Sequence, residues 1–329
     1  MTDKFFRGRR LRLSCELRSF CRETEPILKE NRVMPYFVVE TETRNYKKEI
    51  ASMPDQYQFS ISELIAHLSK QVEKGLKAIL LFGIPAKKDS RASGAYSDDG
   101  IIQEAVRNIK REFPSLLIIT DVCLCEYMDH GHCGILKENG FVDNDATLPL
   151  LAQTALSYVE AGADIIAPSD MMDGRISTIR SALNKHGFSY IPIMSYAIKY
   201  ASACYGPFRE AAQSAPACGD RKSYQMDPAN RLEALSEAKA DLEEGADILI
   251  IKPGNLYADI IRDIRNEVLA PLAAYQVSGE YSMIRAASRL GWINEEALVQ
   301  ESLIALKRAG AKIIITYFTE QLLAKGLAL

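Results

Sequence analysis

Short apolar runs alternate with longer amphipathic stretches along most of the chain. Four times, a stretch with helical periodicity ends in glycine and an apolar run follows at once, as in Glu160-Ala-Gly162 before Ile165-Ile-Ala-Pro168. Glycine is favoured there because the residue after a helix end often adopts a left-handed backbone conformation. The repeated unit predicts helices that alternate with parallel strands.

Eight of the apolar runs have the length and composition of buried strands. They span residues 33–40, 78–83, 116–122, 165–169, 190–196, 246–252, 271–277 and 313–317, and helical stretches at 62–74, 101–112, 148–160, 231–244, 257–267 and 295–308 lie between them. Eight such units are typical of an α/β fold, the closed (β/α)8 TIM barrel. An open doubly wound sheet would need a glycine-rich phosphate loop after its first strand, whereas Glu40 is followed by Thr-Glu-Thr.

Residues 1–30 differ from this pattern and form a separate predicted domain. They are polar and rich in Arg and Glu, with Leu11, Leu13, Leu17 and Phe20 spaced for a short helix. We expect an extended N-terminal arm that makes subunit contacts, with a frayed terminus as the alternative. Residues 31–329 are then the catalytic barrel domain.

Two predicted strands bring a lysine to their carboxyl ends. Lys252 ends one apolar run and precedes Pro253-Gly254, and Lys199 follows the run 190–196. Burial opposes the charged form of a lysine, a neighbouring cation opposes it further, and the neutral amine attacks carbonyl groups. If both face one cavity, the sequence predicts Schiff-base lysines. Lysines whose heads reach solvent are the alternative.

The other predicted strands also end in polar side chains. In a TIM barrel the active site lies where the strands end at their carboxyl side. Residues at these ends are Asp121, Ser169, Asp170, Lys199, Lys252, Ser278 and Tyr317. Because the strands themselves are apolar, we interpret this polar rim as the active site.

The loop after Asp121 holds Cys123, Cys125 and Cys133 together with His130 and His132. Three thiolates suit Zn²⁺, and three protein ligands leave a position open, as in a catalytic site. Either histidine would be a fourth ligand or would hydrogen-bond to a ligand. Free thiols in a loop are the alternative, and the other four cysteines are isolated.

A long connection after Lys199, rich in glycine, proline and serine, runs to Gln225 and is the predicted lid. It carries Arg209 and Arg221, which are candidates to bind a substrate carboxylate through their planar guanidinium groups. An arginine that is only solvated is the alternative.

Composition narrows the classes of function. A chain of 329 residues with 47% hydrophobic and 25% charged residues is long enough for one large core. Its net charge of -3, with basic and acidic residues interleaved, argues against a nucleic-acid-binding protein. No apolar segment of signal-peptide character follows Arg7, Arg9 and Arg10, and no apolar run has membrane length. We therefore expect a cytoplasmic protein without a membrane partner, whose cysteines are reduced or bound to metal.

Seven motifs are specific in combination. They are Asp121-Val-Cys-Leu-Cys125 with His130-Gly-His-Cys133, Pro168-Ser-Asp-Met-Met-Asp-Gly-Arg175, Ser195-Tyr-Ala-Ile-Lys199, Tyr205-Gly-Pro-Phe-Arg209, Gly219-Asp-Arg-Lys-Ser-Tyr-Gln225, Lys252-Pro-Gly254 and Tyr275-Gln-Val-Ser278-Gly-Glu-Tyr281. Together they resemble the porphobilinogen synthase family, also called 5-aminolevulinate dehydratase. The resemblance covers essentially the whole chain.

The resemblance implies a homo-octameric barrel enzyme of tetrapyrrole biosynthesis, with an arm that wraps a neighbouring subunit. Such an enzyme condenses two 5-aminolevulinate molecules into porphobilinogen and releases two waters. It implies Schiff bases on Lys252 with the first substrate and on Lys199 with the second, with Asp121 and Ser169 hydrogen-bonding near them. The implied carboxylate-binding residues are Ser278 and Tyr317 for the first substrate and Arg209, Arg221 and Gln225 for the second, and Tyr205, Phe208 and Tyr275 complete the substrate-binding set.

The resemblance also implies metal sites. Zinc on the three cysteines would bind the amine of the second substrate or supply a base. Family members with aspartates in place of these cysteines work without zinc. The presence of the thiols therefore predicts that this protein depends on zinc. In a bacterial branch of the family, a glutamate holds an allosteric magnesium ion between subunits. Glu237 is at the matching position, which implies a magnesium site there. The alternative is that Glu237 is only solvated. Glu126 and Asp129 depart from the neutral residues of many members, which leaves the metal affinity open.

Two other functions fit part of the sequence. A class I aldolase also uses a Schiff-base lysine on a barrel, but it needs neither a second lysine nor a zinc bound by thiolates. A regulatory barrel protein that binds zinc or senses redox through its cysteines would leave Lys199, Lys252 and the arginines without a role.

Overall fold

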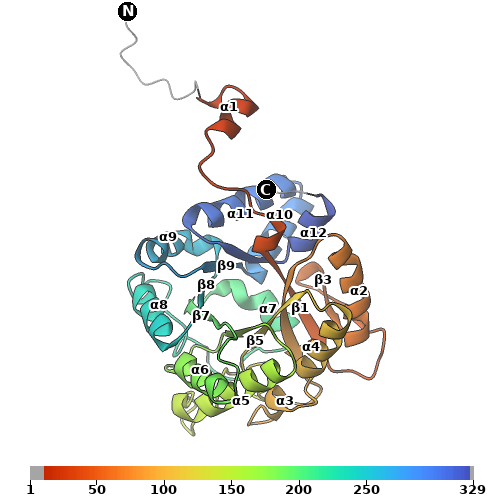
Figure 1. The fold of residues 1–329 in the computed structure, drawn as a ribbon, viewed down its shortest axis with the longest axis vertical. Coiled ribbons are helices and arrows are strands. Elements are labelled where there is room, and N and C mark those ends of the chain that lie inside the picture. The colour runs from red at the N-terminus through yellow and green to blue at the C-terminus, as the bar shows by residue number, and fades with distance from the viewer. Residues whose placement is uncertain (1–10, 327–329) are drawn as a thin grey trace, which may run out of the picture.

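Eight parallel strands form the centre of the computed structural model, which describes residues 11–326 (Figure 1). They are β1 (Arg32–Val39), β4 (Ala78–Ile84), β5 (Leu117–Val122), β6 (Ile165–Pro168), β7 (Met194–Lys199), β8 (Ile248–Lys252), β9 (Leu272–Gln276) and β10 (Ile313–Thr316). Their order is β6-β5-β4-β1-β10-β9-β8-β7, and a parallel bridge between Ile166 and Ile193 joins the two ends. The predicted TIM barrel is confirmed.

Helices surround the barrel, and the predicted ones agree with the structure to within a few residues. The longer helices are α2 (Ile61–Glu73), α4 (Ile101–Glu112), α5 (Asn144–Glu160), α6 (Arg175–Lys185), α8 (Glu233–Glu244), α9 (Ala258–Glu267), α10 (Ser278–Arg289) and α11 (Glu295–Ala309). The short ones are α1 (Cys15–Phe20), α3 (Ser93–Tyr96), α7 (Gly206–Ala211) and α12 (Thr319–Ala324). Helix α5 begins earlier than predicted because the Asp143 side chain accepts from the N–H of Ala146 at 3.2 Å and caps it.

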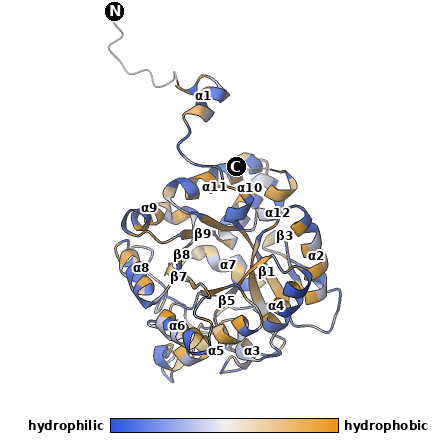
Figure 2. Ribbon diagram, viewed as in Figure 1, coloured by the Kyte–Doolittle hydropathy of each residue, from blue (hydrophilic) through white to orange (hydrophobic). Residues whose placement is uncertain are grey.

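The core lies on both faces of the strands. Every residue of β4 and β9 is buried, because one face fills the barrel and the other meets the helices. Figure 2 shows the hydrophobic colour on the strands and both colours on the surrounding helices. The rigid apolar strands therefore present their polar ends at one rim.

The prediction for the seventh strand is wrong in its bounds. The run 190–196 is apolar, but Tyr190 is 72% exposed and the strand is Met194–Lys199. Its pairing with β8 is irregular, since the step from Ser195 to Ile198 faces the shorter step from Leu249 to Ile251. The extra residue is a β-bulge, after which Lys199 pairs with Lys252. Lys199 thus ends the strand instead of following it.

A hairpin of β2 (Lys47–Ile50) and β3 (Met53–Phe59) was not predicted, because Lys47, Lys48 and Glu49 make no apolar run. Strand β3 pairs with β1 in parallel, with Gln58 opposite Phe37. The side-chain amide of Gln58 donates to the carbonyl of Ala211 at 2.7 Å, at the end of α7. The hairpin therefore supports the helix that begins the predicted lid.

The N-terminal segment from residue 11 to α1 stands away from the barrel (Figure 1). Phe20 is 89% exposed, and Leu11 and Leu13 are also exposed. Residues 1–10 of the predicted arm and 327–329 of the predicted barrel domain lie outside the described residues. None of the helices within residues 11–326 is long and apolar enough to cross a membrane.

Candidate active site

Two buried lysines lie side by side at the carboxyl ends of β7 and β8. Lys199 and Lys252 are each 4% exposed and pair in the strand register, so their side chains leave the sheet on the same face. Both ammonium nitrogens lie over the ring of Tyr196, at 5.8 Å for Lys199 and 5.1 Å for Lys252. The structure therefore brings the two predicted Schiff-base lysines into one site.

The surroundings of Lys252 favour a neutral amine. Its nitrogen lies 4.7 Å from the ring centre of Tyr275, 4.9 Å from that of Phe208 and 5.2 Å from that of Tyr205. Burial, followed by the positive charge of Lys199, lowers the pKa of Lys252 to about 7. An appreciable fraction of this amine is thus nucleophilic near neutral pH.

Asp121 and Ser169 lie beside the lysines, as predicted. The hydroxyl of Ser169 donates to a carboxylate oxygen of Asp121 at 2.9 Å, and the ammonium of Lys199 donates to the Ser169 carbonyl. Burial, followed by the nearby charge of Glu126, raises the pKa of Asp121 to about 7. Asp121 can therefore bind or release a proton near the pH at which Lys252 does.

Polar groups at the ends of β9 and β10 lie on the Lys252 side of the rim. The Ser278 hydroxyl accepts from the N–H of Phe208 at 2.9 Å. The hydroxyls of Tyr275 and Tyr317 are 2.9 Å apart. Because the ring of Tyr275 also faces Lys252, these hydroxyls lie on the Lys252 side of the site.

The predicted lid carries two adjacent guanidinium groups. Burial, and then the charge of Arg221, lowers the pKa of Arg209. Arg221 is buried and donates to the carbonyls of Gly131 at 2.9 Å and Ser214 at 2.5 Å. The Nε atoms of both arginines and both amide atoms of Gln225 are buried and make no hydrogen bond within the protein. The unpartnered Nε groups of the arginines and the Nε2 group of Gln225 are donors that suit a bound carboxylate.

The lid also lies against the cysteine loop. A Cβ on Gly131 would come within 2.4 Å of the Ala215 carbonyl oxygen, so the two backbones are in direct contact. The ring of His132 contacts the carbonyl of Cys218 at 2.9 Å and the hydroxyl of Tyr224 at 3.1 Å. His132 thus joins the cysteine loop to the lid.

Cys123, Cys125 and Cys133 converge as predicted. All three are buried, and their sulfur atoms lie within 4.8 Å of one another. Burial raises the pKa of Cys123 well above its usual value, whereas hydrogen bonds from Cys123 and Cys125 hold the pKa of Cys133 well below it. This is the only group of three or more potential ligand side chains this close within residues 11–326, and it includes neither His130 nor His132.

Glu126 is buried beside this group. One of its oxygens accepts from the Cys125 thiol at 3.2 Å, and the other makes no hydrogen bond within the protein. Burial raises the pKa of Glu126. This carboxylate therefore faces the thiol cluster instead of solvent.

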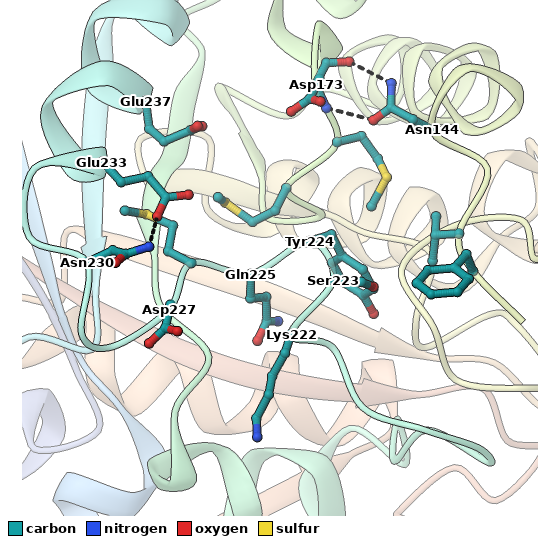
Figure 3. Close-up of a pocket in the computed structure, with 15 residues that line it drawn as sticks. Asn144, Asp173, Lys222, Ser223, Tyr224, Gln225, Asp227, Asn230, Glu233 and Glu237 are labelled. Atoms are coloured by element: carbon teal, nitrogen blue, oxygen red, sulfur yellow. Dashed lines mark hydrogen bonds between the residues drawn. The ribbon is translucent and has the colours of Figure 1, made fainter.

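The last residues of the lid, 222–225, line a cavity of about 440 Å³ (Figure 3). Glu237 and Glu233 of α8 line it, together with Asp173, which exchanges hydrogen bonds with Asn144 at its edge. Burial raises the pKa of Glu237, which is half-buried. Gln225 also lines the cavity, whereas neither Lys199 nor Lys252 does.

Sequence reasoning assigned no role to three side chains of the site. Tyr196 lies under both ammonium groups, Tyr224 contacts the cysteine loop, and Glu280 hydrogen-bonds to the loop after Lys252. All three lie inside the quoted motifs, but only the contacts show what they do. Their spacing carried no signal of its own.

The chain is similar to known proteins over nearly its full length. The sequence model of the family described as "Delta-aminolevulinic acid dehydratase" matches residues 5–325. The chain is 54% identical over 316 residues to the delta-aminolevulinic acid dehydratase of Halalkalibacterium halodurans, covering 96% of this chain and 95% of that protein. It is 53% identical over 320 residues to that of Staphylococcus aureus, covering 97% of this chain and 98% of that protein.

A solved structure is also similar over the whole barrel. It is the delta-aminolevulinic acid dehydratase (porphobilinogen synthase) of Toxoplasma gondii in complex with the reaction product porphobilinogen. The TM-score is 0.95 at 39% identity, covering 99% of this chain and 92% of that chain.

The buried position of Lys252 predicts how its reactivity depends on pH. A lysine with a pKa of about 7 is mostly charged at pH 6 and mostly neutral at pH 8, so we expect imine formation with levulinate to be roughly tenfold faster at the higher pH. The rate is measured by cyanoborohydride trapping and mapping of the Lys252 peptide. In Lys199→Met, which lacks the second cation, the rise should move to higher pH. A rate that is flat or falls between pH 6 and 8 contradicts the assignment.

Proposed function

The chain belongs to the delta-aminolevulinic acid dehydratase family, and we propose that Lys252 and Lys199 are the Schiff-base residues of its reaction. The protein condenses two 5-aminolevulinate molecules into porphobilinogen and two waters, a lyase reaction of porphyrin biosynthesis. The observation that supports the lysine roles is the pair of buried amines in register over one tyrosine ring. A class I aldolase would need only one of them.

The first substrate reacts at Lys252. The neutral amine adds to the ketone carbon, the carbonyl oxygen leaves as water, and a C=N bond replaces the C=O bond. Asp121, whose pKa of about 7 lets it exchange protons, supplies and removes the protons of this dehydration together with the Ser169 hydroxyl. Ser278 and Tyr317 hold the carboxylate, and the rings of Tyr275, Phe208 and Tyr205 exclude water from the amine.

The second substrate reacts at Lys199. Its carboxylate binds Arg209, Arg221 and Gln225, whose buried Nε atoms and side-chain amide make no hydrogen bond within the protein. An imine draws electrons from its neighbouring carbon, which then loses a proton readily and can attack the other substrate. Because the two lysines are paired on adjacent strands, the tethered substrates lie within reach of each other.

We assign zinc to Cys123, Cys125 and Cys133. The three buried, convergent sulfur atoms, with the pKa of Cys133 already lowered, fit the donors and number of a catalytic zinc site. Zinc bound there would act as a Lewis acid toward the second substrate. The protein's own contribution is the buried loop, which Arg221 and His132 attach to the lid.

The proposed assembly is the homo-octamer of the family. Phe20, Leu11 and Leu13 are exposed on a segment that stands away from its own barrel, and a neighbouring subunit would cover them. A cytoplasmic location stays a prediction.

We also propose allosteric magnesium at Glu237. The residue lines the cavity of about 440 Å³ with Glu233 and Asp173 (Figure 3). Glu237 belongs to no cluster of three close ligand side chains among residues 11–326, so the ion would keep several waters, as Mg²⁺ usually does.

Borohydride trapping tests the function directly. With 5-aminolevulinate, mass mapping should find reduced adducts on the peptides of Lys252 and Lys199. Lys252→Met should lower turnover by at least about 10⁴-fold, since a covalent step is lost, and Lys199→Met should retain the Lys252 adduct without product. Adducts on neither lysine in the parent protein would refute the proposal.

Zinc removal gives a second test. We expect one zinc per chain by elemental analysis, and at least about a hundredfold loss of activity after chelation, restored by added zinc. Cys133→Ser should lose both metal and activity, whereas Cys15→Ser, which alters an exposed cysteine of the arm, should lose neither. Full activity in metal-free protein would contradict this site.

Magnesium activation is tested at Glu237. We expect Mg²⁺ to stimulate the parent protein and to leave Glu237→Gln unchanged, because the ion loses its charged ligand. The matched control is Glu243→Gln, an exposed glutamate of the same helix, which should respond like the parent. Equal stimulation of all three proteins removes the magnesium site.

A further inference from the structure

The carboxylate of Glu280 joins two loops that carry proposed substrate-binding residues. Glu280 is the third residue of α10, and only 4% of it is exposed. Oε2 accepts from the N–H of Val277 at 2.8 Å. Oε1 accepts from the N–H groups of Asn255 at 2.8 Å and Leu256 at 3.2 Å. One side chain thus binds the backbone just before Ser278 and the backbone just after Lys252.

Capping of α10 alone does not explain this arrangement. A glutamate at the third helical position commonly turns back to the N–H that precedes the helix, which occupies one oxygen. The second oxygen of Glu280 instead binds a different loop, and burial of the carboxylate raises its pKa to about 7. Burial of a charge is unfavourable unless hydrogen bonds compensate. The three N–H donors compensate only while the two loops stay together.

The loop after Lys252 is fixed on its other side as well. The Asn255 side chain accepts from the amide of Gln276 at 3.1 Å, and Gln276 accepts from the hydroxyl of Thr316 at 2.6 Å. Thr316 directly precedes Tyr317. The hydrogen bonds therefore run from the Lys252 loop across the ends of β9 and β10.

The start of α10 is in turn attached to the lid. The Ser278 hydroxyl accepts from the N–H of Phe208 in α7 at 2.9 Å. A Cβ on Gly279 would lie 2.6 Å from the carbonyl oxygen of Cys204, so the helix start and the lid backbone touch. A shift of α10 relative to the Lys252 loop would thus move Ser278 and Phe208 together.

We propose that Glu280 is a positioning residue for the first substrate. It fixes the separation between the Lys252 amine and the Ser278 hydroxyl, which one bound keto acid must span from its ketone to its carboxylate. The inference rests on the proposed roles of Lys252 and Ser278.

The substitution Glu280→Gln tests the proposal. The amide keeps the size of the side chain but turns an NH₂ group toward N–H donors on one side, so that only one of the two loops stays bound. We expect the half-saturating concentration of 5-aminolevulinate for the borohydride-trapped Lys252 adduct to rise about tenfold or more. KM should rise in parallel. Adduct yields are expressed per folded protein, as measured by circular dichroism.

Two further variants separate positioning from folding. Glu63→Gln alters the same helical position in α2, away from both loops, and should leave adduct formation unchanged. Glu280→Asp keeps the charge but is one methylene short, so its half-saturating concentration should lie between those of the parent and Glu280→Gln. Unchanged half-saturation in both Glu280 variants, or a loss that only follows the unfolded fraction, overturns the proposal. Absence of a Lys252 adduct in the parent would instead refute the proposed function.

Discussion

The site depends on two amines being held together in a place where charge is unfavourable. Lys199 and Lys252 pair across adjacent strands because a bulge in β7 adds one residue before Lys199. A shift of one residue in a strand turns its side chains to the opposite face. Without the bulge, Lys199 would leave the sheet away from Lys252. The register of one strand pair therefore decides whether both lysines meet in one site.

The surrounding barrel makes that register difficult to change. Arg175 is buried and binds both oxygens of Asp241, at 3.1 and 2.9 Å, and its Nη2 donates to the Ser195 hydroxyl at 3.2 Å. Ser195 is the residue of β7 at which the bulge begins. Because an unpaired buried charge is strongly destabilising, this ion pair resists any movement that separates its members. The polar network outside the strands thus supports the position of the lysines inside the barrel.

The sequence predicted the elements whose signal is local. Glycine at helix ends and apolar runs located eight strands, and strand ends located the lysines, Asp121 and the cysteines. The predicted bounds of the seventh strand, 190–196, are wrong because an apolar run shows hydrophobicity but not which of its residues are buried. Tyr190 of this run is exposed. The bulge, the bonds of Glu280 and the contact of His132 with the lid join residues far apart in the chain. Such contacts follow from the closed fold and have no periodic pattern of their own.

Different contacts hold the Lys252 side and the Lys199 side of the site in place. On the Lys252 side, aromatic rings and the Glu280 hydrogen bonds fix the strand ends to one another. On the Lys199 side, the proposed carboxylate-binding residues belong to the predicted lid, which contacts the cysteine loop through Arg221 and His132. The predicted lid also reaches the Lys252 side, where the N–H of Phe208 donates to the Ser278 hydroxyl and the rings of Tyr205 and Phe208 lie beside the amine. The proposed site for the first substrate therefore combines strand ends with α7, whereas the proposed site for the second combines Arg221 and Gln225 with the neighbouring cysteine loop, which would give the two identical substrates different environments.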